Sequence, residues 1–122
     1  MAWSFNEYTP VYLQIADRIR NDIISGVYEK GTQIPPVRQL ALTAAVNPNT
    51  VQHALTELES EGIIYSRGTS GRFVTDDLEI IASARQEAAR KLIKDFIKQA
   101  ESMSIDKKEL IKMLEEEENE YS

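Results

Sequence analysis

Apolar residues recur at steps of three and four over most of the chain, which is the spacing of amphipathic helices. The first stripe follows Thr9 and Pro10, a hydroxyl that can cap a helix and a proline suited to the first helical position. Gly26 ends this helix, and a turn-rich stretch leads to Pro36, which can open a second, shorter helix. The two stripes consist of Tyr12, Ile15, Ala16, Ile19 and Ile23, and of Val37, Leu40, Ala41 and Ala44.

The third predicted helix, residues 47–61, has the clearest signal. Asn47 can cap it, Pro48 fits its first position, and Gly62 follows its end. One face is apolar and consists of Val51, Ala54, Leu55 and Leu58. The opposite face consists of Asn49, His53, Thr56 and Ser60, with Gln52 on its flank. Near the amino end this outer face carries amide, hydroxyl and imidazole groups, which both donate and accept hydrogen bonds.

The period changes after Gly62. Residues 63–67 and 72–75 are rich in β-prone side chains, and the four residues 68–71 between them include two glycines. Such a pair of runs predicts a β-hairpin. Three helices followed by a hairpin within 75 residues is the layout of a winged helix-turn-helix domain.

Helical spacing returns after Asp77 and continues to about Met103, and a further helix is expected from Asp106 with Glu109 in its capping box. The fold class is therefore mainly α with a small β-hairpin: a winged helix-turn-helix domain in residues 1–75 and a two-helix segment in residues 76–122.

The apolar stripe on the first tail helix is wider than the short helix after it can cover. A second copy of the chain would cover the rest, and a twofold dimer is the commonest symmetry for such an arrangement. The expected dimerisation residues are Ile81, Leu92, Ile93, Phe96, Ile97, Leu110 and Leu114.

Composition narrows the function classes. The chain has no cysteine and one histidine, so thiolate chemistry and multi-histidine metal sites are excluded, and no phosphate-binding glycine loop is present. We expect no enzyme, no cofactor and no metal. Neither a signal peptide nor an apolar run of membrane-spanning length is present, so a cytoplasmic protein without a membrane partner is expected.

The net charge of −6 is unevenly distributed. Residues 1–75 hold six basic and seven acidic side chains, whereas residues 76–122 hold eight and thirteen. Because the acidity belongs to the tail, the first part of the chain can still present a locally basic face to a polyanion.

The motif residues in the first part of the chain resemble those of GntR-family bacterial transcription regulators. These are the run from Pro10 to Ile15, Gly26, Gly31, the run from Ile34 to Ala41, the run from Val46 to Val51, the residues Ala54, Leu55 and Leu58, and the runs from Glu61 to Ile64 and from Gly68 to Val74. The resemblance covers about residues 9–75 in register, and the short helical tail is similar to that of the YtrA subfamily.

The resemblance implies that the third helix enters the major groove of DNA by its amino end, with support from the second helix and the wing. The DNA-binding residues that it implies are Arg38, Asn47, Asn49, Thr50, Gln52, His53, Arg67, Gly68, Thr69 and Gly71. Many relatives have arginines where this chain has Pro48 and Gln52, and an amide suits adenine better than guanine.

The sequence therefore predicts a sequence-specific DNA-binding regulator that represses transcription as a homodimer on a palindromic operator. The alternative is a winged-helix protein-interaction module that has lost DNA binding. Single residues also have plainer interpretations: His53 as an inert surface histidine, and Arg67 as a strand-end charge. The tail leaves no evident room for an effector pocket, so we expect operator binding without added ligand. The effector itself is unknown.

Overall fold

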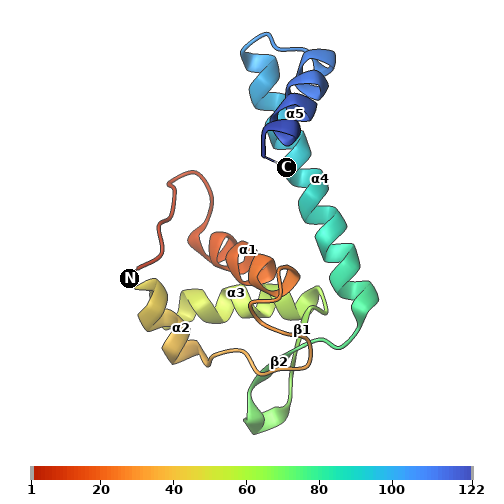
Figure 1. Cartoon of the computed structure of the whole chain (residues 1–122). Helices are drawn as coiled ribbons and strands as arrows, with labels where there is room; N and C mark the ends of the chain where they lie inside the picture. Colours follow the sequence, from red (N-terminus) through yellow and green to blue (C-terminus); the bar gives the residue numbers. More distant parts are fainter. Residues whose placement is uncertain (1, 122) are drawn as a thin grey trace. The chain divides into compact units, whose positions relative to one another are not determined.

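In the residues that the structure describes, the fold consists of five α-helices and one two-stranded antiparallel sheet. Figure 1 shows their arrangement along the chain. The computed structural model describes residues 2–121, with side chains as far as residue 117. The elements are α1 (Val11–Ile24), α2 (Val37–Ala44), α3 (Pro48–Ser60), β1 (Ile64–Ser66), a 3-10 turn η1 (Gly68–Ser70), β2 (Arg72–Val74), α4 (Leu78–Ser102) and α5 (Lys107–Tyr121). The predicted fold class, a winged helix-turn-helix followed by two helices, is confirmed.

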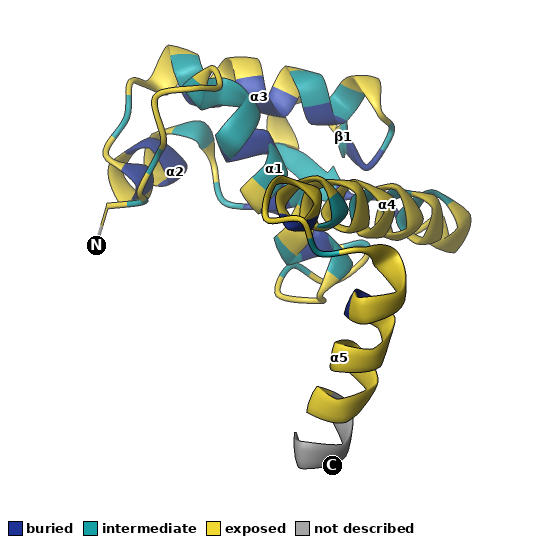
Figure 2. Ribbon diagram, turned by 90° about the horizontal axis from the view of Figure 1, so that it is seen from above, coloured by how far each residue is buried: buried dark blue, intermediate teal, exposed yellow. Residues whose placement is uncertain are grey.

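The core of the first part lies between α1, α2, α3 and the hairpin. Its members are apolar residues that lie on the predicted stripes of the helices, in the strand region or, for Ile34, in the segment before α2. They are Ile15, Ala16, Ile19, Ile23, Ile34, Leu40, Ala41, Val51, Ala54, Leu55, Leu58, Ile63, Ile64 and Val74. Buried bands alternate with exposed ones along α3, as the helical period requires (Figure 2). The apolar face of α3 thus fixes the helix, and its polar face is largely exposed.

The amino ends of two helices differ from the sequence prediction. Pro10 and Pro36 each stand at the N-cap, one position before the helix, with extended ψ angles of 137° and 160°. The predicted cap by the Thr9 hydroxyl is wrong, since no side chain caps α1. The Thr9 backbone is instead held by its neighbours: its carbonyl accepts from the Gln14 side chain at 2.7 Å, and its amide donates to Asn6 at 3.2 Å.

Two other predicted caps are confirmed. The Asn47 side chain accepts a hydrogen bond from the Asn49 amide at 2.8 Å, with Pro48 at the first position of α3. The Asp106 side chain accepts from the Glu109 amide at 2.9 Å and starts α5. A side-chain acceptor at the N-cap position satisfies a backbone amide of the first helical turn, which has no hydrogen-bond partner within the helix.

The hairpin pairs Ile64 with Val74, Tyr65 with Phe73 and Ser66 with Arg72. The segment before α2, which the sequence indicated only as turn-rich, runs along the other edge of β2. Gln33 forms a bridge with Phe73, and the Ile34 amide donates to the Arg72 carbonyl at 3.0 Å. The wing is therefore supported on both sides of β2.

The chain divides into two compact units, one ending at Arg85 and the other beginning at Gln86. The first unit extends beyond residue 75 because Ile80, Ile81 and Ala84 pack against its core. The second unit contains the rest of α4 and α5. Among its described side chains, the apolar residues Ala100 and Leu110 are buried, and most of the other apolar ones are exposed.

Candidate nucleic-acid interface

The turn between α2 and α3 is short and tightly bonded. Ala45 takes a left-handed conformation with φ 59°, and its amide bonds back to the carbonyls of Ala41 and Leu42. The Val46 amide donates to the Ala41 carbonyl at 3.1 Å. This pattern closes the end of α2 and places the Asn47 cap directly after it. The two helices therefore form the helix-turn-helix unit that the sequence predicted.

The outer face of α3 is polar near its amino end. Asn49, Gln52 and His53 are exposed, as predicted, whereas Thr50 is half-buried. No acidic side chain lies in the first turn of α3. Amide and imidazole groups on an exposed helical face are the kind that can hydrogen-bond to base edges in the major groove. The amino end of α3 also offers the partial positive charge that anions prefer.

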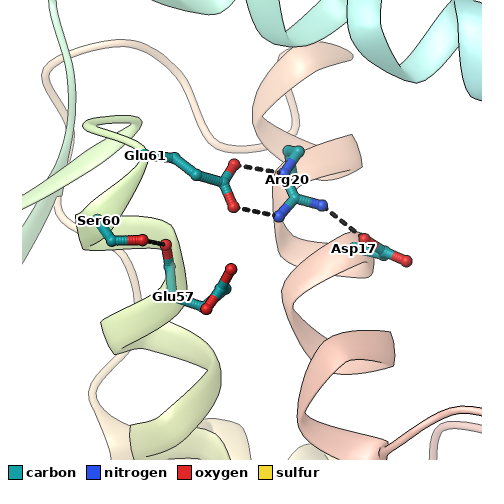
Figure 3. Close-up of polar contacts among 5 residues, drawn as sticks. All are labelled: Asp17, Arg20, Glu57, Ser60 and Glu61. Atoms are coloured by element: carbon teal, nitrogen blue, oxygen red, sulfur yellow. Dashed lines mark hydrogen bonds and ion pairs between the residues drawn. The ribbon is translucent and has the colours of Figure 1, made fainter.

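The acidic side chains near the carboxyl end of α3 are Glu57, Glu59 and the C-cap residue Glu61, and arginines of neighbouring elements pair with two of these three. Arg20 of α1 bonds to Glu61 through Nη2 at 2.5 Å and Nε at 2.8 Å (Figure 3). The hydrogen bond to Glu61 raises the pKa of the Arg20 guanidinium, which stays charged. Arg72 of β2 forms an ion pair with Glu59. These pairs offset two negative charges beside the polar face.

His53 has a neighbour that sequence reasoning did not assign to the site. Its imidazole stacks on the ring of Tyr12, with ring centroids 3.5 Å apart and the planes within 7° of parallel. Tyr12 stands in the first turn of α1 and is half-buried against the core. The sequence indicated Tyr12 only as a core residue, since no local pattern links it to the distant His53.

The wing tip contains all four of the residues predicted for it. Arg67, Gly68 and Thr69 are exposed, and Gly71 is half-buried. The Arg67 guanidinium lies 4.8 Å from the centroid of the Phe73 ring, a cation–π contact that leaves it near the surface. The wing thus presents a cation next to a glycine-rich loop with small side chains.

Gln33 supports the wing tip through a hydrogen bond, a role that the sequence did not indicate. Its side-chain amide donates to the Ser70 carbonyl at 2.7 Å. Gly71 has φ 104°, and a Cβ there would lie 2.6 Å from the Gln33 Nε2 atom. The positive φ favours glycine at this position, and a Cβ there would push the Gln33 amide away from the wing tip. The ends of the wing loop are further joined by the Arg67 amide, which donates to the Gly71 carbonyl at 2.9 Å.

Arg38 lies in the first turn of α2 and is exposed. Within the described part of the chain, its side chain makes no hydrogen bond or ion pair. It differs in this respect from Arg20 and Arg72, which are engaged by carboxylates. A guanidinium without an internal partner remains free to bind an external anion.

The residues predicted for dimerisation differ in how far they are buried within the single chain. Ile81 packs on the core of the first unit, and Leu110 is buried within the second. Leu92, Ile93 and Phe96 are exposed on α4, with 72%, 56% and 46% of their surface accessible. Leu114 of α5 is also exposed, and Ile97 of α4 is half-buried.

A groove of about 320 Å³ lies between α4 and α5 within the second unit. The sequence led us to expect no room for an effector pocket in the tail, and this groove goes against that expectation. Its lining is mainly apolar and consists of Phe96, Gln99, Ala100, Met103, Ile105, Leu110, Met113, Leu114 and Glu117. The lining includes two of the predicted dimerisation residues that are exposed, Phe96 and Leu114.

Neither a metal cluster nor a membrane helix is found in the part of the chain that the structure describes. No group of three or more His, Cys, Asp or Glu side chains among those residues could hold an ion. None of the described helices is both long enough and apolar enough to cross a bilayer.

A helix-turn-helix with a polar helix face, followed by a two-stranded wing with an exposed arginine at its tip, defines the winged helix class of DNA-binding domains. The chain belongs to the GntR family of bacterial regulatory proteins, whose sequence profile matches residues 11–74. The resemblance seen in the sequence is thereby confirmed.

Individual relatives extend the similarity into the tail. The transcriptional regulator YhcF of Bacillus subtilis is 33% identical over 107 residues, with 88% of each chain covered. The transcriptional repressor YtrA of the same organism is 34% identical over 91 residues, which cover 75% of this chain and 68% of YtrA.

Solved structures have the same fold. A GntR family transcriptional regulator from Listeria monocytogenes superposes with a TM-score of 0.83 at 34% identity, over 92% of this chain and 98% of that one. The structure of AraR(DBD) in complex with operator ORX1 has a TM-score of 0.54 at 28% identity, over 62% of this chain and 92% of that one.

Proposed function

We propose that this chain is a transcription regulator that binds a palindromic operator as a homodimer and represses the genes beside it. The observation that carries the proposal is the outer face of α3, which is exposed, polar and free of acidic groups in its first turn. Family membership supports it, as do the similarity to the repressor YtrA and to a domain solved on its operator. We propose no catalytic role, and we place the protein in the cytoplasm, where bacterial DNA lies.

Base reading is assigned to the exposed side chains of α3. Asn49, Gln52 and His53 point away from the core at the amino end of the helix, which is the end that helix-turn-helix proteins insert into the major groove. Asparagine and glutamine pair well with adenine through its N6 and N7 atoms. We therefore propose an operator in which adenines are read at one or two positions of each half-site.

Backbone contacts are assigned to the elements around α3. The exposed Arg38 is proposed to bind a phosphate, since no carboxylate of the described residues engages it. Asn47 and Thr50 lie at the amino end of α3, where peptide N–H groups also favour phosphate. The wing residues Arg67, Gly68, Thr69 and Gly71 are proposed to approach the minor groove, whose negative potential attracts arginine.

Residues 1–75 would thus bind DNA, and residues 76–122 would form the dimer. Leu92, Ile93, Phe96 and Leu114 are proposed as the centre of the contact because they are large, apolar and exposed in a single chain. Ile81, Ile97 and Leu110 are partly or wholly used for packing within the chain, so we place them at the margin of the dimer contact.

Selection from genomic DNA tests the proposal. The purified full-length protein is mixed with sheared genomic fragments, and the retained fragments are sequenced. We expect one shared inverted repeat, with half-sites about 34 Å apart or a multiple of this, as two linked winged domains require. A variant with Arg38→Ala and Asn49→Ala is the control and should enrich the same repeat more weakly, with the preference at one position of each half-site relaxed. Retention of fragments without a shared sequence, or of none, would contradict the proposal.

A further inference from the structure

The stack of His53 on Tyr12 places an aromatic residue of α1 at the edge of the polar face of α3. The two rings overlap almost in parallel at 3.5 Å between centroids. Tyr12 is anchored, since it is half-buried against the core, whereas His53 is exposed. The contact therefore joins a fixed ring to one that would otherwise sample several rotamers.

The stack on Tyr12 constrains the orientation of the His53 imidazole. One face of the imidazole is covered, and its two nitrogens lie in the ring plane, at the uncovered edge. Rotation about the side-chain bonds would break the overlap, so the edge is held in one direction. Immobilising a free side chain on binding costs about 0.5–1.5 kcal/mol, and a stack that exists before binding removes most of that cost.

His53 is placed where a fixed orientation of its imidazole edge can serve in reading a base. His53 follows Asn49 by one helical turn, and both are exposed on the face that carries Gln52. A leucine at position 12 would fill the same half-buried space without offering a flat surface. The Tyr12 hydroxyl makes no hydrogen bond within the described residues, so the ring and not the hydroxyl is engaged in the fold.

We propose that Tyr12 is a positioning residue for sequence readout: its ring holds the His53 imidazole so that its edge reads one base pair in each half-site. This proposal rests on the proposed function and deepens it, because it identifies His53 as a base reader and names the residue through which its geometry is set. Tyr12 itself does not contact the base.

The test compares full-length variants on one DNA probe, a duplex that the wild-type protein has selected from a random pool. The variants are Tyr12→Phe, Tyr12→Leu, His53→Ala and the double variant Tyr12→Leu with His53→Ala. Tyr28→Leu is the matched control, because Tyr28 is also half-buried against the core but makes no ring contact with α3. Affinity is measured by fluorescence anisotropy, base preference by single-pair substitutions in the probe, and folding by thermal unfolding.

We expect His53→Ala to weaken binding about tenfold and to remove the preference at one position of each half-site. Tyr12→Leu should cause most of the same loss at the same position, and the double variant should bind no worse than His53→Ala alone. Tyr12→Phe, which keeps the stack, should stay within about twofold of wild type. Tyr28→Leu should lower the unfolding temperature and leave the base preference unchanged.

Three results would overturn the proposal: wild-type base preference in Tyr12→Leu, losses that multiply in the double variant, or a loss in Tyr12→Phe as large as in Tyr12→Leu. The last would assign the role to the hydroxyl. Failure of the wild-type protein to select any duplex would overturn the proposed function, and this inference with it. This failure of the proposed function can be distinguished from failure of the present inference, because it is seen with the wild-type protein before any variant is tested.

Discussion

Arg20 of α1 and Glu61 at the carboxyl end of α3 are joined by two parallel hydrogen bonds, Nη2 to Oε2 at 2.5 Å and Nε to Oε1 at 2.8 Å. Asp17 accepts a third bond from the same guanidinium at 2.6 Å. The pair links the two helices that share the core and fixes one end of α3. Together with the Arg72–Glu59 pair, it holds α3 from two neighbouring elements.

Removing this link should lower the free energy of unfolding. Because the pair is bidentate but partly open to solvent, we expect Arg20→Ala and Glu61→Ala each to cost about 1 kcal/mol. The double variant should cost clearly less than the sum, with a coupling energy of about 0.5–1 kcal/mol. Urea unfolding of the four proteins measures this. Strictly additive losses would mean that the pair contributes nothing to stability.

Ala45 offers a test of the turn between α2 and α3. Its φ of 59° is a left-handed conformation that favours glycine. Ala45→Gly should therefore raise the free energy of unfolding by about 0.5–1 kcal/mol, after the greater flexibility of glycine in the unfolded chain is counted. The matched control is Leu42→Gly at an exposed position inside α2, which should lower it by about 0.8 kcal/mol. A loss of stability in Ala45→Gly would contradict this account of the turn.

The helices, two of the caps and the hairpin could be predicted because their signals are local. The stripe on α3 and the Asn47 cap lie within a few residues of each other, and the period of 3.6 fixes which face is buried. The same reasoning placed Asn49, Gln52 and His53 on the exposed face.

What could not be predicted depends on contacts between distant residues. Gln33 reaches Ser70 over 37 positions, and the stack of Tyr12 with His53 joins two helices. Thr9 is a case in which a local signal was misleading. Threonine is a suitable residue type for a cap, but the side chains of Asn6 and Gln14 bond to the Thr9 backbone, and its hydroxyl does not cap the helix. Propensity indicates what a residue can do, and tertiary neighbours decide what it does.

Two substitutions separate phosphate contacts from base contacts. Arg38→Ala should weaken binding to all DNA sequences alike and flatten the logarithmic salt dependence by about one unit, because one phosphate contact is lost. Asn49→Ala should cost about 1–3 kcal/mol on the selected operator and relax the preference at one position of each half-site. Anisotropy titrations at several salt concentrations measure both. If both variants bind as tightly as wild type, the proposed docking of α3 is wrong.

A charge on the exposed face of α4 tests the proposed dimer. Leu92→Asp should shift the protein from dimer to monomer in sedimentation equilibrium, because an unpaired carboxylate would be buried at the centre of the contact. Affinity for a two-half-site duplex should fall by about 10² with loss of the linked second domain. Lys94→Asp, at a nearby exposed position, should remain dimeric. A dimeric Leu92→Asp protein would place the interface elsewhere.

The central claim, that the outer face of α3 reads DNA sequence, is tested most directly by titrating the full-length protein against its selected duplex and a scrambled duplex of the same composition. The titration is made at about 0.15 M salt without any added small molecule, since specificity has meaning only at a stated salt concentration. We predict a preference of about 10³ or more for the selected duplex, with two chains bound per palindrome. Equal affinity for both duplexes, or binding that begins only when a small molecule is supplied, would contradict the account.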